Sequence, residues 1–176
     1  MKGSKPVGRP RVGQAPVGQP MAAMRGDRWP RLVNGSSVLA EHETCVDAWV
    51  RRTTKNLPED ALMPLFQSAL TGLWDRTKTT LGEVTLAAIA ERVVHSASEK
   101  HPLLLLEVEP TGGIVCEGLR EPGSASDDEV IAAIRFVLVE FLTVLGNLTA
   151  QILTPELHEE LSKVIQPASK GEGKRP

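Results

Sequence analysis

Tyrosine is missing from the 176-residue sequence, aromatic side chains make up only 3% of it, and cysteine occurs twice. Cys45 and Cys116 lie far apart in a chain without an apolar export signal, a combination typical of reduced thiols rather than a disulfide framework. A long apolar run is lacking too, because Arg135, Glu140 and two amides interrupt the most apolar window, residues 130–153. We therefore expect a cytoplasmic protein without a membrane span.

Strong net charge is also lacking. The formal net charge of -2 argues against a chain that coats nucleic acid along its whole length. Hydrophobic residues make up 41% and charged residues 24%, which suits one compact core and excludes a fibrous or wholly disordered chain. The length favours one domain.

The charge is unevenly distributed along the chain. Residues 1–36 carry seven basic residues and one acidic residue, hence +6, and the remainder carries 13 basic and 21 acidic residues, hence -8. The same segment holds 6 of the 15 glycines and 5 of the 13 prolines. Such a composition cannot bury enough apolar surface to offset chain entropy, so we expect a disordered basic arm over residues 1–36 and a disordered tail over 167–176. Met21 and Met24 are alternative translation starts, from which the arm would not be made.

The region between arm and tail, residues 37–166, is expected to be one helical domain. Apolar residues at helical spacing predict a first helix over about Val38 to Thr54. Pro58 suits the first turn of a second helix, and Gly82 marks a break before a third.

The period of the apolar residues then changes. Apolar runs on either side of Pro110-Thr111-Gly112-Gly113 predict a β-hairpin at about 103–119. Ser126 and Glu129 form a capping-box pattern that predicts the start of a helix reaching about Leu153. Thr154 is the expected cap of a short last helix. The predicted fold is mainly α (α+β): a helical bundle around one long central helix, with a single β-hairpin inserted before it.

Apolar residues in this long helix are spaced 3, 4, 3, 4, 3 and 4, which predicts an unbroken a/d seam over three heptads. Two interpretations stand together: the central core helix of the domain, and a homodimeric helical interface. The predicted interface residues are Ile131, Ile134, Leu138, Phe141, Leu145, Leu148 and Ile152.

Arg135 lies off the polar stripe of this helix. An unpaired charge among leucines and valines is costly, so we expect the guanidinium to reach water or to pair with a carboxylate. By charge, Glu107, Glu109 and Glu117 on the hairpin are the expected partners, and an anion-binding role is the alternative.

Catalytic patterns are scarce. The sequence contains no GxSxG elbow, phosphate loop or GxGxxG turn. His42 and Cys45 share a helix face, but no further zinc-ligand motif accompanies them. Glu107 and Glu109 alternate onto one strand face as paired carboxylates would, although solvated acids are commoner there. We predict a protein that is not an enzyme and has no metal or cofactor.

Two short stretches resemble known families. Residues 5–11 resemble the AT-hook, a minor-groove-binding motif, through Gly8-Arg9-Pro10 flanked by Lys5 and Arg11. The resemblance implies contact with A·T-rich DNA, and it departs from the family where Val7 replaces the usual arginine. Residues 158–161, His-Glu-Glu-Leu, resemble the phosphoacceptor stretch of histidine kinases, but the proline that follows it and an ATP-binding domain are missing.

The leading hypothesis is a non-enzymatic regulatory or scaffolding module that acts through helix–helix association. Its partner would be itself, as a homodimer, or another helical protein, and a sensor-type signalling domain fits the same pattern. One alternative is a DNA-associated protein tethered by the basic arm. A further alternative is a small-molecule or haem-binding sensor that uses a cleft between hairpin and long helix.

Overall fold

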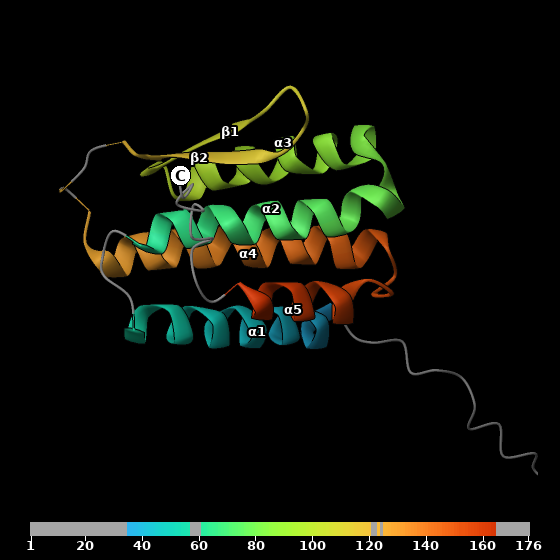
Figure 1. Cartoon of the computed structure of the whole chain (residues 1–176), viewed down its shortest axis with the longest axis horizontal. Helices are drawn as coiled ribbons and strands as arrows, with labels where there is room; N and C mark the ends of the chain where they lie inside the picture. The colour runs from blue at the N-terminus through green and yellow to red at the C-terminus, as the bar shows by residue number, and fades with distance from the viewer. Residues whose placement is uncertain (1–34, 57–60, 121–122, 124, 165–176) are drawn as a thin grey trace, which may run out of the picture. The chain divides into compact units, whose positions relative to one another are not determined.

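The computed structural model describes residues 35–56, 61–120, 123 and 125–164. This part of the chain is mainly helical, with five helices and one two-stranded antiparallel hairpin that precedes the fourth helix (Figure 1). The predicted fold class is thereby confirmed. The elements are α1 (Gly35–Asn56), α2 (Leu62–Leu81), α3 (Glu83–Lys100), β1 (Leu104–Val108), β2 (Ile114–Leu119), α4 (Asp127–Leu148) and α5 (Thr154–Lys163).

The start of α4 follows directly from its local sequence. The Ser126 side chain accepts a hydrogen bond from the Glu129 backbone N–H, and the Glu129 carboxylate accepts one from the Ser126 backbone N–H. This reciprocal capping box satisfies two backbone donors that the helix itself leaves without partners. The predicted start of the long helix is therefore confirmed.

The end of α4 differs from the prediction. The helix stops at Leu148 rather than about Leu153, because Ala150 and Gln151 adopt left-handed backbone angles, with φ of 48° and 66°. The Gln151 N–H donates to the Gly146 carbonyl at 2.7 Å, which closes the turn. Thr154 is the first residue of α5 rather than its cap, and its hydroxyl bonds the Gln151 side chain at 2.7 Å.

The core surrounds α4. Helices α1, α3 and α5 all contact it, and α2 packs against α5 and α3. Ten residues of α4 are buried, among them Ile134, Leu138, Phe141 and Leu145, each no more than 1% exposed. The interpretation of this helix as the centre of its own domain is correct, since helices of the same chain cover its apolar sides.

The hairpin lies on α2 and α3 (Figure 1). The Gln67 side chain on α2 donates to the Ile114 carbonyl at 3.1 Å and accepts from the Cys116 N–H at 2.8 Å. One amide thus satisfies two backbone groups along β2. Gly112 in the turn, at φ 88°, lies so close to Trp74 that a Cβ there would stand 2.7 Å from the indole. These contacts explain how two strands alone can be stable.

No helix among the described residues is sufficiently long and apolar to span a membrane. Residues 1–34 of the predicted arm, with the AT-hook-like residues Lys5 to Arg11, and the tail after residue 166 lie outside the described part of the chain. The last two residues of the predicted arm, Gly35 and Ser36, instead begin α1.

Candidate functional site

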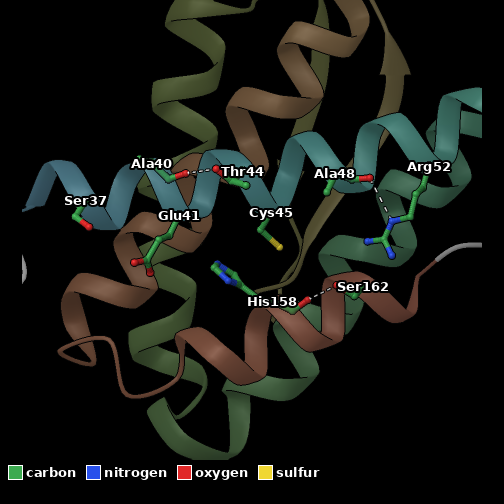
Figure 2. Close-up of a pocket in the computed structure, with 9 residues that line it drawn as sticks. All are labelled: Ser37, Ala40, Glu41, Thr44, Cys45, Ala48, Arg52, His158 and Ser162. Carbon is green, nitrogen blue, oxygen red and sulfur yellow. Dashed lines mark hydrogen bonds between the residues drawn. The ribbon is translucent and has the colours of Figure 1, made fainter.

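An open groove of about 590 Å³ runs between α1 and α5 (Figure 2). α1 supplies most of its lining, and α5 contributes one imidazole and one hydroxyl. The lining residues are Ser37, Ala40, Glu41, Thr44, Cys45, Ala48, Arg52, His158 and Ser162. Among these nine residues there is no large aliphatic side chain and no benzene or indole ring, the groups that most often enclose small-molecule ligands.

A pair of histidines links α1 to α5 beside the groove. His42 is fully buried, and its Nδ1 lies 2.9 Å from Nε2 of His158, a hydrogen-bonding distance. His42 Nε2 has no hydrogen-bond partner in the described structure and lies 3.0 Å from the point where a Cβ on Gly146 would stand. Because residue 146 has no side chain, α4 can approach His42 closely. Three helices therefore meet at this imidazole.

Burial favours the neutral forms of the two imidazoles and of the Cys45 thiol. Burial, and then the neighbouring His158, lower the pKa of His42 to about 4. Burial also lowers the pKa of His158, against the opposing effect of the Glu41 carboxylate. Burial raises the pKa of the Cys45 thiol more than the Arg52 charge lowers it. At neutral pH both imidazoles are uncharged and Cys45 is a thiol, the less nucleophilic form of the sulfur.

The groove does not assemble a catalytic pair from the residues described. No hydrogen bond joins Cys45 to His158, and the Ser162 hydroxyl donates to the His158 backbone carbonyl at 2.7 Å rather than to its ring. Nucleophilic catalysis requires a base within hydrogen-bond reach of the nucleophile. The described residues also contain no group of three or more His, Cys, Asp or Glu side chains arranged to hold a metal ion.

Charge is segregated along one exposed stripe of α1, which lies beside Glu43 and Asp47, the two acids that pair with Arg135. We call this surface the outer face of α1 and define it by residues at helical spacing: Ser37, Ala40, Glu41, Thr44, Ala48, Arg51, Arg52 and Lys55. The acid lies in the N-terminal half, the bases lie in the C-terminal half, and small side chains lie between them. No described residue forms an ion pair with Glu41, Arg51 or Arg52.

The predicted seam divides into two groups. Ile134, Leu138, Phe141 and Leu145 are buried by helices of the same chain, and Ile131 is half-buried. These positions belong to the core, so the four buried side chains offer no surface to a second protein. Leu148 and Ile152, at the far end of the seam, are 53% and 77% exposed.

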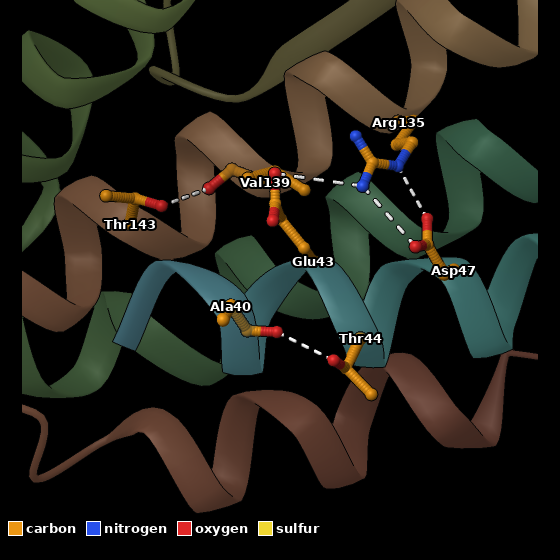
Figure 3. A network of polar contacts seen from close by, with 7 residues as sticks. All are labelled: Ala40, Glu43, Thr44, Asp47, Arg135, Val139 and Thr143. Atoms are coloured by element: carbon orange, nitrogen blue, oxygen red, sulfur yellow. Dashed lines mark hydrogen bonds and ion pairs between the residues drawn. The ribbon is translucent and has the colours of Figure 1, made fainter. Parts of the chain in front are cut away.

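The predicted partners of Arg135 are wrong. Its Nε donates to Asp47 Oδ1 at 2.5 Å, and its Nη2 lies 3.3 Å from Asp47 Oδ2 and 3.7 Å from Glu43 Oε1 (Figure 3). The guanidinium thus joins α4 to α1 and lowers the pKa of the Asp47 carboxyl. The hairpin acids Glu107 and Glu109 belong instead to a hairpin that packs on α2 and α3.

Comparison with known proteins gives no assignment. No family model, curated protein or solved structure matches this chain.

Sequence reasoning missed the histidine pair, since His42 and His158 are 116 residues apart. No local sequence pattern indicates that two residues so far apart in the chain are in contact. The outer face of α1 is legible in the sequence as charges at helical spacing, but the stronger apolar pattern of α4 led to an interface prediction on that helix instead.

Proposed function

We propose that this chain is a non-enzymatic interaction module that forms a homodimer, and that the second copy binds along the outer face of α1. The observation that carries the proposal is the charge segregation of that face, with Glu41 at one end and Arg51 and Arg52 at the other. A two-fold symmetric contact brings the same surface of both copies together, so the surface must complement itself. A face that is acidic at one end and basic at the other complements a second copy of itself when the two helices are antiparallel.

The spacing along α1 supports a specific register. With the two-fold axis crossing the outer face at the level of Val46, whose side chain is buried on the other side of α1, Thr44 of one copy faces Ala48 of the other. The same register places Glu41 of each copy opposite Arg51 of the other copy, so the dimer has two such pairs. Arg52 follows Arg51 directly in the chain. Small side chains at the centre allow two helices to approach at the short end of the usual 8–10 Å spacing. The groove beside α5 leaves room for the partner's helix.

The expected dimer is weak and sensitive to salt. One helix from each copy makes a contact at the small end of the range for specific interfaces. Each exposed ion pair contributes about 0–1 kcal/mol and is screened as ionic strength rises. The module would therefore associate reversibly, which suits a regulatory or scaffolding role better than a permanent assembly.

Sedimentation velocity over a concentration series, at low and high salt, tests the proposal. Wild type should gain mass with concentration at low salt and lose it at high salt. R51E/R52E should remain monomeric because both halves of the outer face become acidic. E41R should remain monomeric because both halves become basic. The matched control is R92E, which reverses an exposed charge on α3 and should behave like wild type.

Mixing the two defective variants distinguishes a specific contact from damage to the fold. R51E/R52E and E41R carry complementary faces, so an equimolar mixture should regain the dimer. A strictly monomeric wild type, or a mixture that stays monomeric while both variants are folded, would contradict the proposed interface.

A further inference from the structure

The two outer edges of the hairpin differ in how their backbone groups are satisfied. The edge of β2 is closed by α2, because the Gln67 side chain bonds both the Ile114 carbonyl and the Cys116 N–H. β1 forms the other edge, since the sheet has two strands in the order β1-β2. No side chain in the described part of the chain bonds the backbone of β1. The fold therefore closes one edge of this sheet and leaves the other open.

The backbone groups at the open edge can be identified from the hydrogen bonds of the turn. The Glu109 N–H donates to the Gly113 carbonyl at 2.8 Å, so residue 109 directs its backbone groups toward the returning strand. Successive residues of an antiparallel strand alternate in this direction. The residues of β1 that point away from β2 are therefore Leu104, Leu106 and Val108. The Leu104 N–H donates to the His101 carbonyl at 3.2 Å, which leaves three carbonyls and two N–H groups without a described partner.

β1 carries none of the usual protections of an open edge. Such an edge is a template for another strand, and proteins usually block it with proline, with lysine or with a distortion of the strand. β1 reads Leu-Leu-Leu-Glu-Val, with neither proline nor lysine. The register shift of the hairpin places its extra residue, Glu117, on β2, so β1 itself stays regular. In Figure 1 the hairpin is the outermost layer on its side of the helices.

The two faces of the hairpin beside this edge differ in character. Leu104 and Leu106 are 3% and 8% exposed, because they face the helices beneath. The opposite face is exposed and acidic, with Glu107 on β1, Glu109 just after it and Glu117 on β2. No described residue forms an ion pair with any of these three carboxylates. A strand added to β1 would therefore meet negative charge on its outer face.

We propose that β1 accepts an extended segment of a partner protein as a third, antiparallel strand, and that this segment carries cations at alternate positions with apolar residues between them. Backbone hydrogen bonds to the edge would supply affinity, and the side chains would supply specificity. A cation opposite Glu107 falls in a non-hydrogen-bonded pair, where the Cα atoms are about 4.5 Å apart and the side chains are close. A second cation two residues away faces Glu109. The intervening side chains point, like Leu106, toward α3.

A second copy of this chain fits the edge less well than a cationic segment. Pairing two copies through β1 would bring the three acids of each hairpin to one continuous face, and like charges on neighbouring strands are destabilising. Charge complementarity therefore selects a basic partner. The inference does not rest on the homodimer, because the hairpin packs on α2 and α3 whereas the outer face belongs to α1.

Fluorescence anisotropy of the full-length chain with a labelled peptide of alternating lysine and valine tests the proposal. Wild type should bind this peptide. It should not bind a peptide with glutamate in place of lysine, or one with N-methyl groups on the valine nitrogens, which would face β1. E107K should bind several-fold more weakly, while D75K, which reverses an exposed charge on α2, should bind like wild type. V108P should bind at least tenfold more weakly because proline lacks the outward N–H, whereas V108A keeps that group and should bind.

Hydrogen exchange of individual amides locates the bound peptide. The N–H groups of Leu106 and Val108 should exchange several-fold more slowly with the peptide than without it, and the Cys116 N–H, already bonded to Gln67, should not change. Absence of binding to wild type, equal binding of the N-methylated peptide, or protection only at other residues would overturn the proposal. The N-methylated peptide tests the edge without altering the protein, so the result stands even if circular dichroism shows V108P unfolded.

Two further results separate this edge from contacts between copies of the chain. Slower exchange of Leu106 and Val108 that grows with protein concentration, without peptide, would overturn the proposal by assigning the edge to a second copy. R51E/R52E should bind the peptide like wild type. Failure of peptide binding would therefore leave the proposed function standing, and a monomeric wild type that binds the peptide would contradict only the homodimer.

Discussion

Acidification should destabilise this protein through His42. The imidazole is fully buried between three helices, and its pKa falls from 6.5 to about 4 in the folded protein. An unfolded chain exposes the ring and lets it bind a proton at its ordinary pKa. Between these two pKa values the unfolded state binds more protons than the folded state, so the free energy of unfolding falls as the pH falls.

The size of the effect follows from the two pKa values. Stability is unaffected by this group above about pH 6.5, declines by up to about 1.4 kcal/mol per pH unit below it, and levels off near pH 4. The total loss is about 3 kcal/mol. His158 shifts in the same direction and adds to the decline. This is a large part of the stability of a typical domain.

Urea unfolding followed by circular dichroism, from about pH 7 to pH 4, measures the decline. H42Q removes the titrating ring, so the slope of its stability against pH should be less than half that of wild type, whatever its stability at neutral pH. H95Q changes an exposed histidine and should retain the full slope. Equal slopes in wild type and H42Q would refute the argument that burial of His42 causes the decline.

Two further predictions concern packing. G146A should lower the free energy of unfolding by about 1–3 kcal/mol, because its Cβ would stand 3.0 Å from the fully buried His42 ring, which has no free space to move into. G72A is its control, since no atom lies closer than 3.5 Å to a Cβ there, and it should be neutral or stabilising. Q67A should cost about 1–3 kcal/mol, since two backbone groups of β2 lose their partner. Chemical denaturation measures all three, and a neutral G146A or Q67A would contradict the contacts described.

Local chemistry made the elements predictable. Ser126 and Glu129 predict the start of α4, because the hydrogen bonds of a capping box join residues within four positions of each other. The proline and glycines before Ile114 predict the hairpin, since such residues favour the backbone angles of a turn. The end of α4 was not predictable from the apolar pattern, because Ile152 continues the spacing although the backbone has already turned.

The candidate site was only partly predictable. The outer face of α1 is a local pattern, with Glu41 and Arg52 on one side of a predicted helix. Whether that side faces solvent depends on how α1 docks, and the apolar pattern of α1 alone did not single it out. The pairing of His42 with His158 could not be predicted, since it depends on how α1 and α5 pack together.

The sequence by itself determined which segments are helices, where the hairpin lies and which helix is central. These properties depend on caps, turns and the period of apolar residues, all of which act over a few residues. Tertiary structure alone decided the partner of Arg135, the burial of the middle of the α4 seam and the exposure of its end at Ile152. The physical reason is that charge pairing and burial depend on which segments meet in space. A single sequence carries no local signal for contacts between residues that are 88 or 116 positions apart.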